Sequence, residues 1–426
     1  MNIKLKIISS VLWVGVFVQT GFAQNLDDYK IEAAQNNPQL RAVYFEYLSA
    51  LEQVPQVGAL PDPELSFAWF VRPVETRLGP QQARISVTQM LPWFGTRKQN
   101  VSGRLLAAKA KFEHFRETRN QLFYQMEVLW AELFEATEKI RLAKENLEIV
   151  NTLVNVSLRK YETGLVPQVD VLRAQIEQED LKTNIALLED DLEIVMSAFN
   201  KLRNAPLHSE VTVPKALQES NGISSREKEI REQVISNNPD IHRLRLLEQK
   251  AEVDVENASN QNKPSFGVGL DYIATGERTD VPTLADNGRD AVIARLNIKV
   301  PLFRAKNRAK TQEATYALSA SRDRISDRTN QLEQAVIAEI RALRDAQRRY
   351  ELYDEQQIYR VQQAVNIMLQ SYATDNSDFE EILRLQRKLF EYELERIKAK
   401  TDQFKVVARL DYLSGSNNVS MQDINY

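Results

Sequence analysis

The sequence contains no cysteine, and this absence excludes structural disulfides, thiol catalysis and cysteine-ligated metal sites. It also excludes the lipidated N-terminal cysteine that anchors many exported proteins. Histidine is rare: His114, His208 and His242 are scattered, without the short spacings that hold zinc in hydrolases. The formal net charge of -4 gives no basic field for nucleic acid. Because no nucleophile, general base, metal site or cofactor site is recognisable, we expect a protein that is not an enzyme.

The N-terminus has the three parts of a secretory signal peptide at residues 1–23. Lys4 and Lys6 precede the apolar run at 7–18, and a short segment ending in Ala23 comes before Gln24. About twelve apolar residues are too few to cross a bilayer, which needs roughly 20. We therefore expect an exported chain that begins near Gln24, with neither a transmembrane helix nor a lipid anchor.

The chain contains two copies of one pattern. The matching segments are residues 37–40 and 238–241, Pro63 and Pro264, residues 91–94 and 300–303, and Tyr161 and Tyr372. The offset between matching residues is 201 for the first two pairs, 209 for the third and 211 for the last. The second copy therefore carries an insertion of eight residues and then two more. We expect a signal peptide at 1–23 and structural repeats at 24–221 and 222–426, each with a helix, two strands, a long helix and a shorter helix.

The long helices are predicted from the spacing of apolar residues. Between Gly95 and Glu162 there is no proline, and apolar residues recur at steps of four and three from Leu122 to Val154. A helix of this length measures roughly 100 Å, so we expect it to pack against the returning helix as an antiparallel coiled-coil hairpin. The second copy predicts the same layout at 307–374 and 379–413. Its long helix has a weaker apolar seam, because Glu339 stands between Val336 and Leu343.

Each copy also contains two segments with strict alternation of apolar and polar residues. In the first copy they lie at 65–71 and 85–88, separated by a polar, proline-bearing loop, and in the second at 266–272 and 292–300. A soluble antiparallel sheet would show the same alternation, but thin coiled coils cannot cover two strand pairs. We therefore predict a membrane barrel with lipid-facing Leu65, Phe67, Trp69, Val292, Leu296 and Ile298. Because four strands cannot close a barrel, several chains must contribute to it.

The order of these features resembles the TolC-like outer-membrane efflux family. The likeness rests on the duplicated layout, the segment Leu91-Pro92-Trp93-Phe94-Gly95 after a strand, and residues 161–165 ahead of Asp170-Val171-Leu172. The resemblance implies a mainly helical fold with membrane strands, in which a homotrimer forms a 12-stranded β-barrel, four strands per chain, that continues into a long coiled-coil barrel. It implies an outer-membrane location with the helices in the periplasm.

The resemblance also implies a function and partners. Members are exit ducts of tripartite efflux pumps, and they conduct substrates passively from an inner-membrane transporter and a periplasmic adaptor protein to the exterior. Residues 86–95 look most like the branch that works with cation-exporting pumps of the resistance-nodulation-division (RND) type, so the expected substrates are metal cations or drugs. No nucleic-acid partner and no cofactor are implied.

Two sets of site residues are carried over from the family. The periplasmic entrance gate is expected at Asp170, Tyr372, Asp375, Asp378, Glu380 and Glu381. The family's latch arginine falls at Ser377, and one of its two ring acids falls at Arg384, so part of the lock is missing. The tips that dock the adaptor are expected at Thr163, Gly164, Leu165, Val166, Asn376 and Ser377. The acids would equally serve to solvate a turn and to stabilise a helix N-terminus.

Other functions stay open at this point. An outer-membrane channel for type I polypeptide secretion would have the same fold and differ only in its partner pump. A periplasmic adaptor has a coiled-coil hairpin, but normally one hairpin beside soluble β domains. A structural coiled-coil protein would share the heptads and lack the strands.

Overall fold

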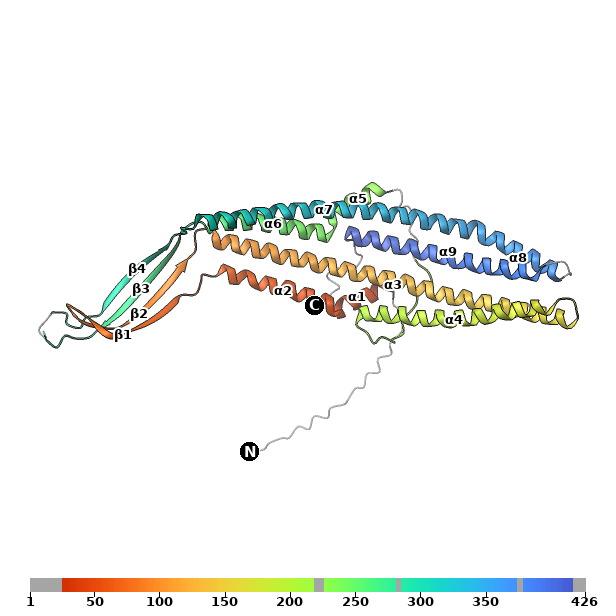
Figure 1. Cartoon of the computed structure of the whole chain (residues 1–426), viewed down its shortest axis with the longest axis horizontal. Coiled ribbons are helices and arrows are strands. Elements are labelled where there is room, and N and C mark those ends of the chain that lie inside the picture. Colours follow the sequence, from red (N-terminus) through yellow and green to blue (C-terminus); the bar gives the residue numbers. More distant parts are fainter. Residues whose placement is uncertain (1–24, 218–225, 281–284, 374–377, 417–426) are drawn as a thin grey trace, which may run out of the picture.

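A computed structural model describes residues 25–217, 226–280, 285–373 and 378–416. The predicted signal peptide and the turn residues Asp375, Asn376 and Ser377 lie outside the described residues. The chain forms a long body of helices with a small sheet at one end (Figure 1). Among the described residues, no helix carries an apolar stretch long enough to cross a membrane.

The second half of the chain repeats the element order of the first half with one addition. The first half contains α1 (Leu26–Asn36), α2 (Pro38–Gly58), β1 (Glu64–Thr76), β2 (Gly79–Leu91), α3 (Thr96–Glu162) and α4 (Gln168–Arg203). The second contains α5 (Glu227–Asn237), α6 (Pro239–Asn260), β3 (Ser265–Thr275), β4 (Ala291–Lys299), α7 (Arg304–Glu351), the π-helical segment η2 (Leu352–Gln357), α8 (Ile358–Ala373) and α9 (Phe379–Ser414). The predicted helix at 307–374 is therefore interrupted by η2, whereas α3 is continuous, as predicted.

In each half, an asparagine stands between the first two helices, Asn37 between α1 and α2 and Asn238 between α5 and α6. The Asn37 side chain accepts a hydrogen bond from the backbone N–H of Leu40 and donates one of 2.9 Å to the carbonyl of Leu202 at the end of α4. Asn238 caps α6 in the same way and donates a bond of 2.8 Å to the carbonyl of Leu413 in α9. The Asn-Pro motif is thus a helix start that also holds the returning helix.

All four strands belong to one antiparallel sheet in the order β1-β2-β3-β4, so the two predicted strand pairs join edge to edge. The prediction of a proline-bearing loop between the first two strands was wrong, because β1 and β2 both extend to a tight turn at residues 77–78. Pro73 is accommodated where the register shifts between Trp69 and Val74. β1 is an edge strand, so the missing N–H of Pro73 need not cost a ladder hydrogen bond.

The helices lie side by side in one layer (Figure 1). Near the sheet, α3 packs between α2 and α6, and α6 packs against α7. Toward the far end, α3 packs between α4 and α9, and α9 packs against α8. The predicted antiparallel pairing of the two long helices in each half is confirmed, and α3 lies inside the layer while α7 and α8 lie at its edge.

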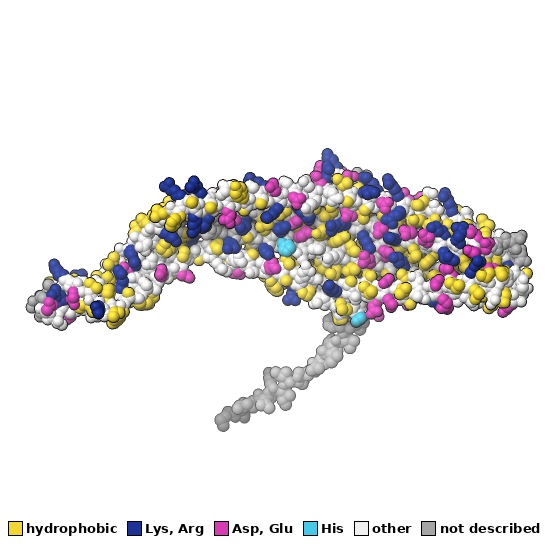
Figure 2. All heavy atoms as spheres, viewed as in Figure 1, with side chains coloured by type: hydrophobic (Ala, Val, Ile, Leu, Met, Phe, Trp, Pro, Cys, Tyr) yellow, Lys and Arg dark blue, Asp and Glu magenta, His cyan; other side chains and the backbone are white. Residues whose placement is uncertain are grey.

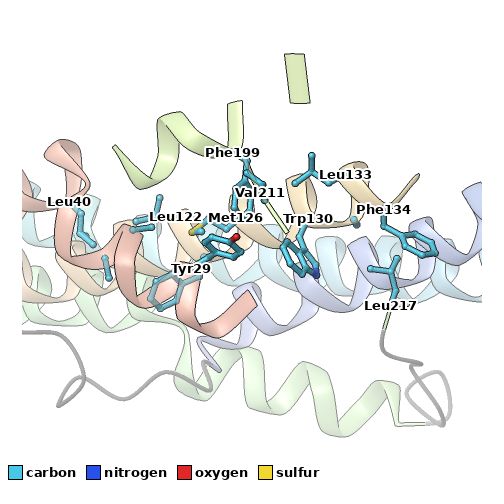
Figure 3. Close-up of a cluster of buried hydrophobic side chains, with 14 of the residues drawn as sticks. Tyr29, Leu40, Leu122, Met126, Trp130, Leu133, Phe134, Phe199, Val211 and Leu217 are labelled. Atoms are coloured by element: carbon cyan, nitrogen blue, oxygen red, sulfur yellow. The ribbon is translucent and has the colours of Figure 1, made fainter. Parts of the chain in front are cut away.

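The largest apolar cluster lies midway along the body, where α1 covers α3 and α4 (Figure 3). The Tyr29 ring lies 5.8 Å from that of Trp130 and 5.3 Å from that of Phe199, centroid to centroid. Its hydroxyl accepts a hydrogen bond from the backbone of Thr212, which satisfies the polar atom of a buried ring.

The apolar seam of α7 differs from the predicted one. Ile340, which is almost fully buried, occupies the position between Val336 and Leu343 that the sequence pattern assigned to Glu339. Glu339 lies one residue outside the seam, and its carboxylate is 4.0 Å from Arg409 of α9. Burial raises the pKa of Glu339, and Arg409 acts in the opposite direction. The seam is therefore continuous at this point and no polar interruption occurs.

Candidate functional site

One face of the sheet is apolar and open to the surroundings. The register aligns Phe67 with Ile85, Ile85 with Tyr272, and Tyr272 with Val292, so these side chains form one row on one face. Trp69 on the same face is 78% exposed. The residues predicted to face lipid are all more than half exposed on this face: Leu65, Phe67, Trp69, Val292, Leu296 and Ile298.

The opposite face of the sheet carries a charged cluster. Asp271 is only 1% exposed. Its carboxylate forms ion pairs with Arg84 of β2, at 3.2 Å, and with Arg295 of β4, at 2.6 Å. Arg295 is aligned with Gly269, and a Cβ at that glycine would lie 3.5 Å from the Arg295 Nε. Arg295 therefore extends past Gly269 along β3 to reach Asp271 two residues further on.

Both edges of the layer lack a partner within the chain. β1 and β4 each pair on one side only. The edge helices carry apolar side chains that are more than a third exposed: Val169, Leu172, Ile176, Leu187 and Ile194 on α4, Tyr316 and Ile337 on α7, and Tyr359 and Ile367 on α8. Monomeric soluble proteins rarely expose so many large apolar groups along two edges.

At the far end from the sheet, α3 ends in a Schellman motif. The backbone N–H of Gly164 bonds to the carbonyl of Tyr161, and that of Leu165 bonds to the carbonyl of Lys160, both at 2.9 Å. Gly164 has a φ of 73°, a left-handed conformation that favours glycine. Leu165 is half-exposed at the tip, and Thr163 donates its hydroxyl to the carbonyls of Arg159 and Lys160. The four residues predicted in this turn therefore form a rigid, partly apolar tip.

The tips of the two helical hairpins pack on each other. Tyr372 of α8 and Phe379 of α9 lie in a cluster with Leu153 of α3 and Ala174 of α4, and Val166 packs against it. The rings of Tyr372 and Phe379 are 5.2 Å apart. This contact brings together residues that are about 200 positions apart in the sequence.

Two of the predicted gate residues meet at this contact. Asp170 on α4 is buried, and burial raises its pKa while Arg173 acts in the opposite direction. Burial and the nearby charge of Asp170 raise the pKa of Tyr372 to about 12. The Tyr372 hydroxyl has no hydrogen-bond partner among the described residues. Lys160 donates to the Tyr372 backbone carbonyl, and its Nζ lies 4.2 Å from the centre of the ring.

The remaining predicted gate acids lie at the start of α9. Asp378 caps the helix by accepting a hydrogen bond of 3.0 Å from the backbone of Glu380. Glu380 forms an ion pair of 2.8 Å with Arg173 of the first hairpin, and Glu381 accepts two hydrogen bonds from Arg384. Two of the three acids are thus paired with arginine, and Asp375 lies outside the described residues.

Sequence reasoning missed the residues that link the two hairpins. Arg173 is one, and Arg387 of α9 is another, with its Nε 2.9 Å from a Glu177 carboxylate oxygen of α4. Gln386 donates a buried hydrogen bond of 2.9 Å to Asn146 of α3. Each pair joins one hairpin to the other, so no local spacing in the sequence could have revealed it.

No group of three or more metal-ligating side chains occurs within the part of the chain that the structure describes. The described residues thus show two features at opposite ends of the molecule, the two-faced sheet and the contact between the hairpin tips. Comparison with known proteins shows what they resemble.

Residues 31–205 match the model of the outer membrane efflux protein family. The structure of the outer membrane protein VceC from Vibrio cholerae aligns with a TM-score of 0.76 and 16% identity, over 92% of this chain and 96% of VceC. The MtrE outer membrane channel of Neisseria gonorrhoeae, in its open state, aligns with a TM-score of 0.72 and 16% identity, over 92% of this chain and 89% of MtrE.

The CmeC outer membrane channel of Campylobacter jejuni aligns with a TM-score of 0.70 and 15% identity, over 97% of this chain and 93% of CmeC. The comparison with curated protein sequences gives no match. Residues 31–205 are therefore similar to the outer membrane efflux protein family, whose members are channels, and the likeness of fold to known outer membrane channels extends over the rest of the described chain.

Proposed function

We propose that the protein is the outer-membrane exit duct of a tripartite efflux pump. Three copies form a 12-stranded barrel in the outer membrane, and their helices form a tunnel across the periplasm. The duct conducts substrates passively. An inner-membrane pump supplies the substrate through a periplasmic adaptor protein.

The single observation that carries this proposal is the four-stranded sheet with two faces and two open edges. Its outer face is apolar and exposed, and its inner face holds the Arg84, Asp271 and Arg295 cluster. An apolar exterior and a polar interior are what a membrane barrel requires. An open edge in lipid would leave backbone groups without partners, so β4 of one copy is expected to pair with β1 of the next.

The helical edges support the same assembly. The exposed apolar side chains of α4 lie on one edge of the layer, and those of α7 and α8 lie on the other. Closing three layers into a ring would bury both sets at once. The interface is heterologous and closes after three copies.

The hairpin tips are proposed to form the periplasmic entrance. Asp170, Tyr372, Asp375, Asp378, Glu380 and Glu381 would surround it in three copies. The ion pairs from Arg173 to Glu380 and from Arg384 to Glu381 lower the net negative charge of this mouth. The acids that remain favour cations, which agrees with a pump for metal ions or cationic drugs. The adaptor would dock on Thr163, Gly164, Leu165 and Val166 and on Asn376 and Ser377.

The absence of cysteine allows a direct test of the barrel. Leu296 and Asn297 are neighbours in β4 that point to opposite faces. In outer-membrane vesicles, Asn297→Cys should react with a charged, membrane-impermeant thiol reagent, because it faces a water-filled pore. Leu296→Cys should react only after detergent is added.

Amine crosslinking of the same membranes checks the assembly. A ladder that ends at three chains is expected, and the unmodified chain serves as the control for labelling. Equal labelling of both cysteines in intact membranes, or recovery of a soluble monomer, would contradict the proposal.

A further inference from the structure

Hydrophobic and basic side chains gather where the strands pass into the helices, beside the apolar surface of the sheet (Figure 2). We call this set the rim cluster. It consists of Trp93, Phe94, Lys98, Lys263, Arg304 and Arg308.

The aromatic part of the rim cluster continues the apolar face of the sheet. The Trp93 ring is stacked on Phe266, with centroids 6.1 Å apart, and the register aligns Phe266 with Ile298 on the apolar face. Phe94 packs edge-on against Trp93 and is 82% exposed. Large aromatic rings at the border of an apolar band are typical of a membrane–water interface.

No acid among the described residues forms an ion pair with the basic part of the rim cluster. The Lys263 Nζ lies 5.5 Å from the centre of the Trp93 ring. Lys98, Arg304 and Arg308 are exposed and form no ion pair with any residue that the structure describes. Arg304 and Arg308 are one turn apart and therefore lie on the same side of α7.

The fold itself gives no reason for these bases. Five helices, α1, α4, α5, α6 and α9, carry acids in their first turn, as the helix dipole favours. The helices that follow strands, α3 and α7, begin instead with Arg97 and Lys98 and with Arg304 and Lys306, and have no acid in the first turn. Positive charge at a helix start opposes the dipole, so an anion from outside the chain would relieve the conflict.

We propose that the rim cluster binds the phosphate groups of anionic phospholipids in the leaflet nearest the helices. The inference rests on the proposed function, because it requires the sheet to lie in a bilayer. Trp93 and Phe94 would lie at the level of the headgroups, and the long basic side chains would reach the phosphates. Acids also lie near the rim cluster. Asp62 and Glu64 lie at the start of β1, Glu256 of α6 accepts a hydrogen bond from Gln99, and Glu313 lies five residues beyond Arg308 on α7.

The test uses the full-length protein in nanodiscs of phosphatidylcholine mixed with phosphatidylglycerol. The variant carries Lys98→Gln, Lys263→Gln, Arg304→Gln and Arg308→Gln. The matched control removes the same charge from exposed bases elsewhere on the helices, with Lys109→Gln, Lys201→Gln, Arg348→Gln and Lys398→Gln. The readout is the ratio of the two lipids that stay bound when the protein is released into detergent and analysed by native mass spectrometry.

The unmodified protein and the control should retain phosphatidylglycerol in excess over its share of the bilayer. The rim variant should lose this excess, by roughly fivefold for each base that contacts a headgroup. An excess that survives in the rim variant, or that the control loses equally, would overturn the inference. If the protein does not enter the nanodiscs at all, the proposed channel function fails as well, so the two failures are distinguishable.

Discussion

The long helices of the two halves share a sequence pattern but differ in their surroundings. α3 has helices on both sides and buries residues along its whole length. α7 packs against α6, α9 and the short helix α5, buries only six residues in 48, and passes into η2 before α8 begins. A duplicated sequence thus gives one interior helix and one edge helix, because the copies lie side by side and not face to face.

This difference shows how two similar halves can differ in the apolar surface that they leave exposed for contact with another chain. None of the apolar residues of α3 that the structure describes is as much as half exposed, whereas Ile337 of α7 and Ile367 of α8 are more than half exposed. The edge copy keeps an apolar surface that no described part of the chain covers, as the proposed trimer requires. The two halves are alike in layout and complementary in environment.

The largest effect is expected from comparing the truncation of a buried apolar residue of α3 with that of an exposed one of α7. Leu133 of α3 is fully buried, so Leu133→Ala should lower the free energy of unfolding by about 2–5 kcal/mol. Ile337→Ala should change the stability of the separated chain little and weaken trimer formation instead. Urea unfolding and crosslinking of the two variants in detergent check this. A large loss of chain stability from Ile337→Ala would contradict the distinction between interior and edge.

A smaller effect is expected at the turn of the first hairpin. No atom lies within 4 Å of a Cβ built on Gly164, so Gly164→Ala should cost only the backbone strain of its left-handed φ, about 1–2 kcal/mol locally. Combined with Leu165→Ser it should abolish pump-dependent resistance while the amount of trimer stays normal. Leu207→Ser, on a similarly exposed residue in the loop after α4 and away from the tip, is the control. Unchanged resistance would place adaptor docking elsewhere.

The link between the halves at the tips is expected to contribute less. The pair of Arg173 and Glu380 is partly exposed, so removing it with Glu380→Gln, which leaves the pair of Arg173 and Asp170 in place, should cost about 0.2–1 kcal/mol. The loosened contact between the tips should raise single-channel conductance. Lys182→Gln, which removes an ion pair with Glu179 inside α4, is the control and should have no effect on conductance. Unchanged conductance in Glu380→Gln would show that the pair does not hold the tips together.

The smallest effect depends on pH. Burial raises the pKa of Asp170 above its unfolded value, with Asp378 adding to the shift and Arg173 opposing it, so the fold favours the protonated form. The ionised form therefore destabilises the tip at neutral pH, and this cost disappears as the pH falls through the folded pKa. Asp170→Asn should slow hydrogen exchange of the tips at about pH 7 and leave it unchanged at about pH 4.

The neighbours of Asp170 decide whether that result holds. Tyr372, Lys160, Arg173, Asp378 and Glu380 all lie at the same contact between the hairpins. Faster exchange in Asp170→Asn at neutral pH would mean that the attraction between Asp170 and Arg173 outweighs the cost of burial. Measuring the original chain and the variant at each pH removes the intrinsic pH dependence of exchange.

The sequence predicts features that depend on local periodicity. The 67 residues of α3 and the two faces of β4 follow from the spacing of their own apolar residues. Features that depend on packing were missed or misplaced. The seam of α7 was misplaced by one residue at Glu339, since a half-buried edge helix has a broad apolar stripe, and β1 continues past Pro73 because an edge strand tolerates proline. The partners of Glu177 and Glu380 lie in the other hairpin, beyond any local pattern.

The π-helical segment η2 also explains a difference in length between the copies. Phe94 and Tyr161 are 67 residues apart, whereas the matching Phe303 and Tyr372 are 69 apart. A π-turn contains more residues than an α-turn and so takes up part of the surplus without disturbing the packing beyond it. Tyr372 is still buried at the end of α8. An alignment of the two halves should therefore open its gap at 352–357, and insertions in related sequences are expected to collect at this point of the helix.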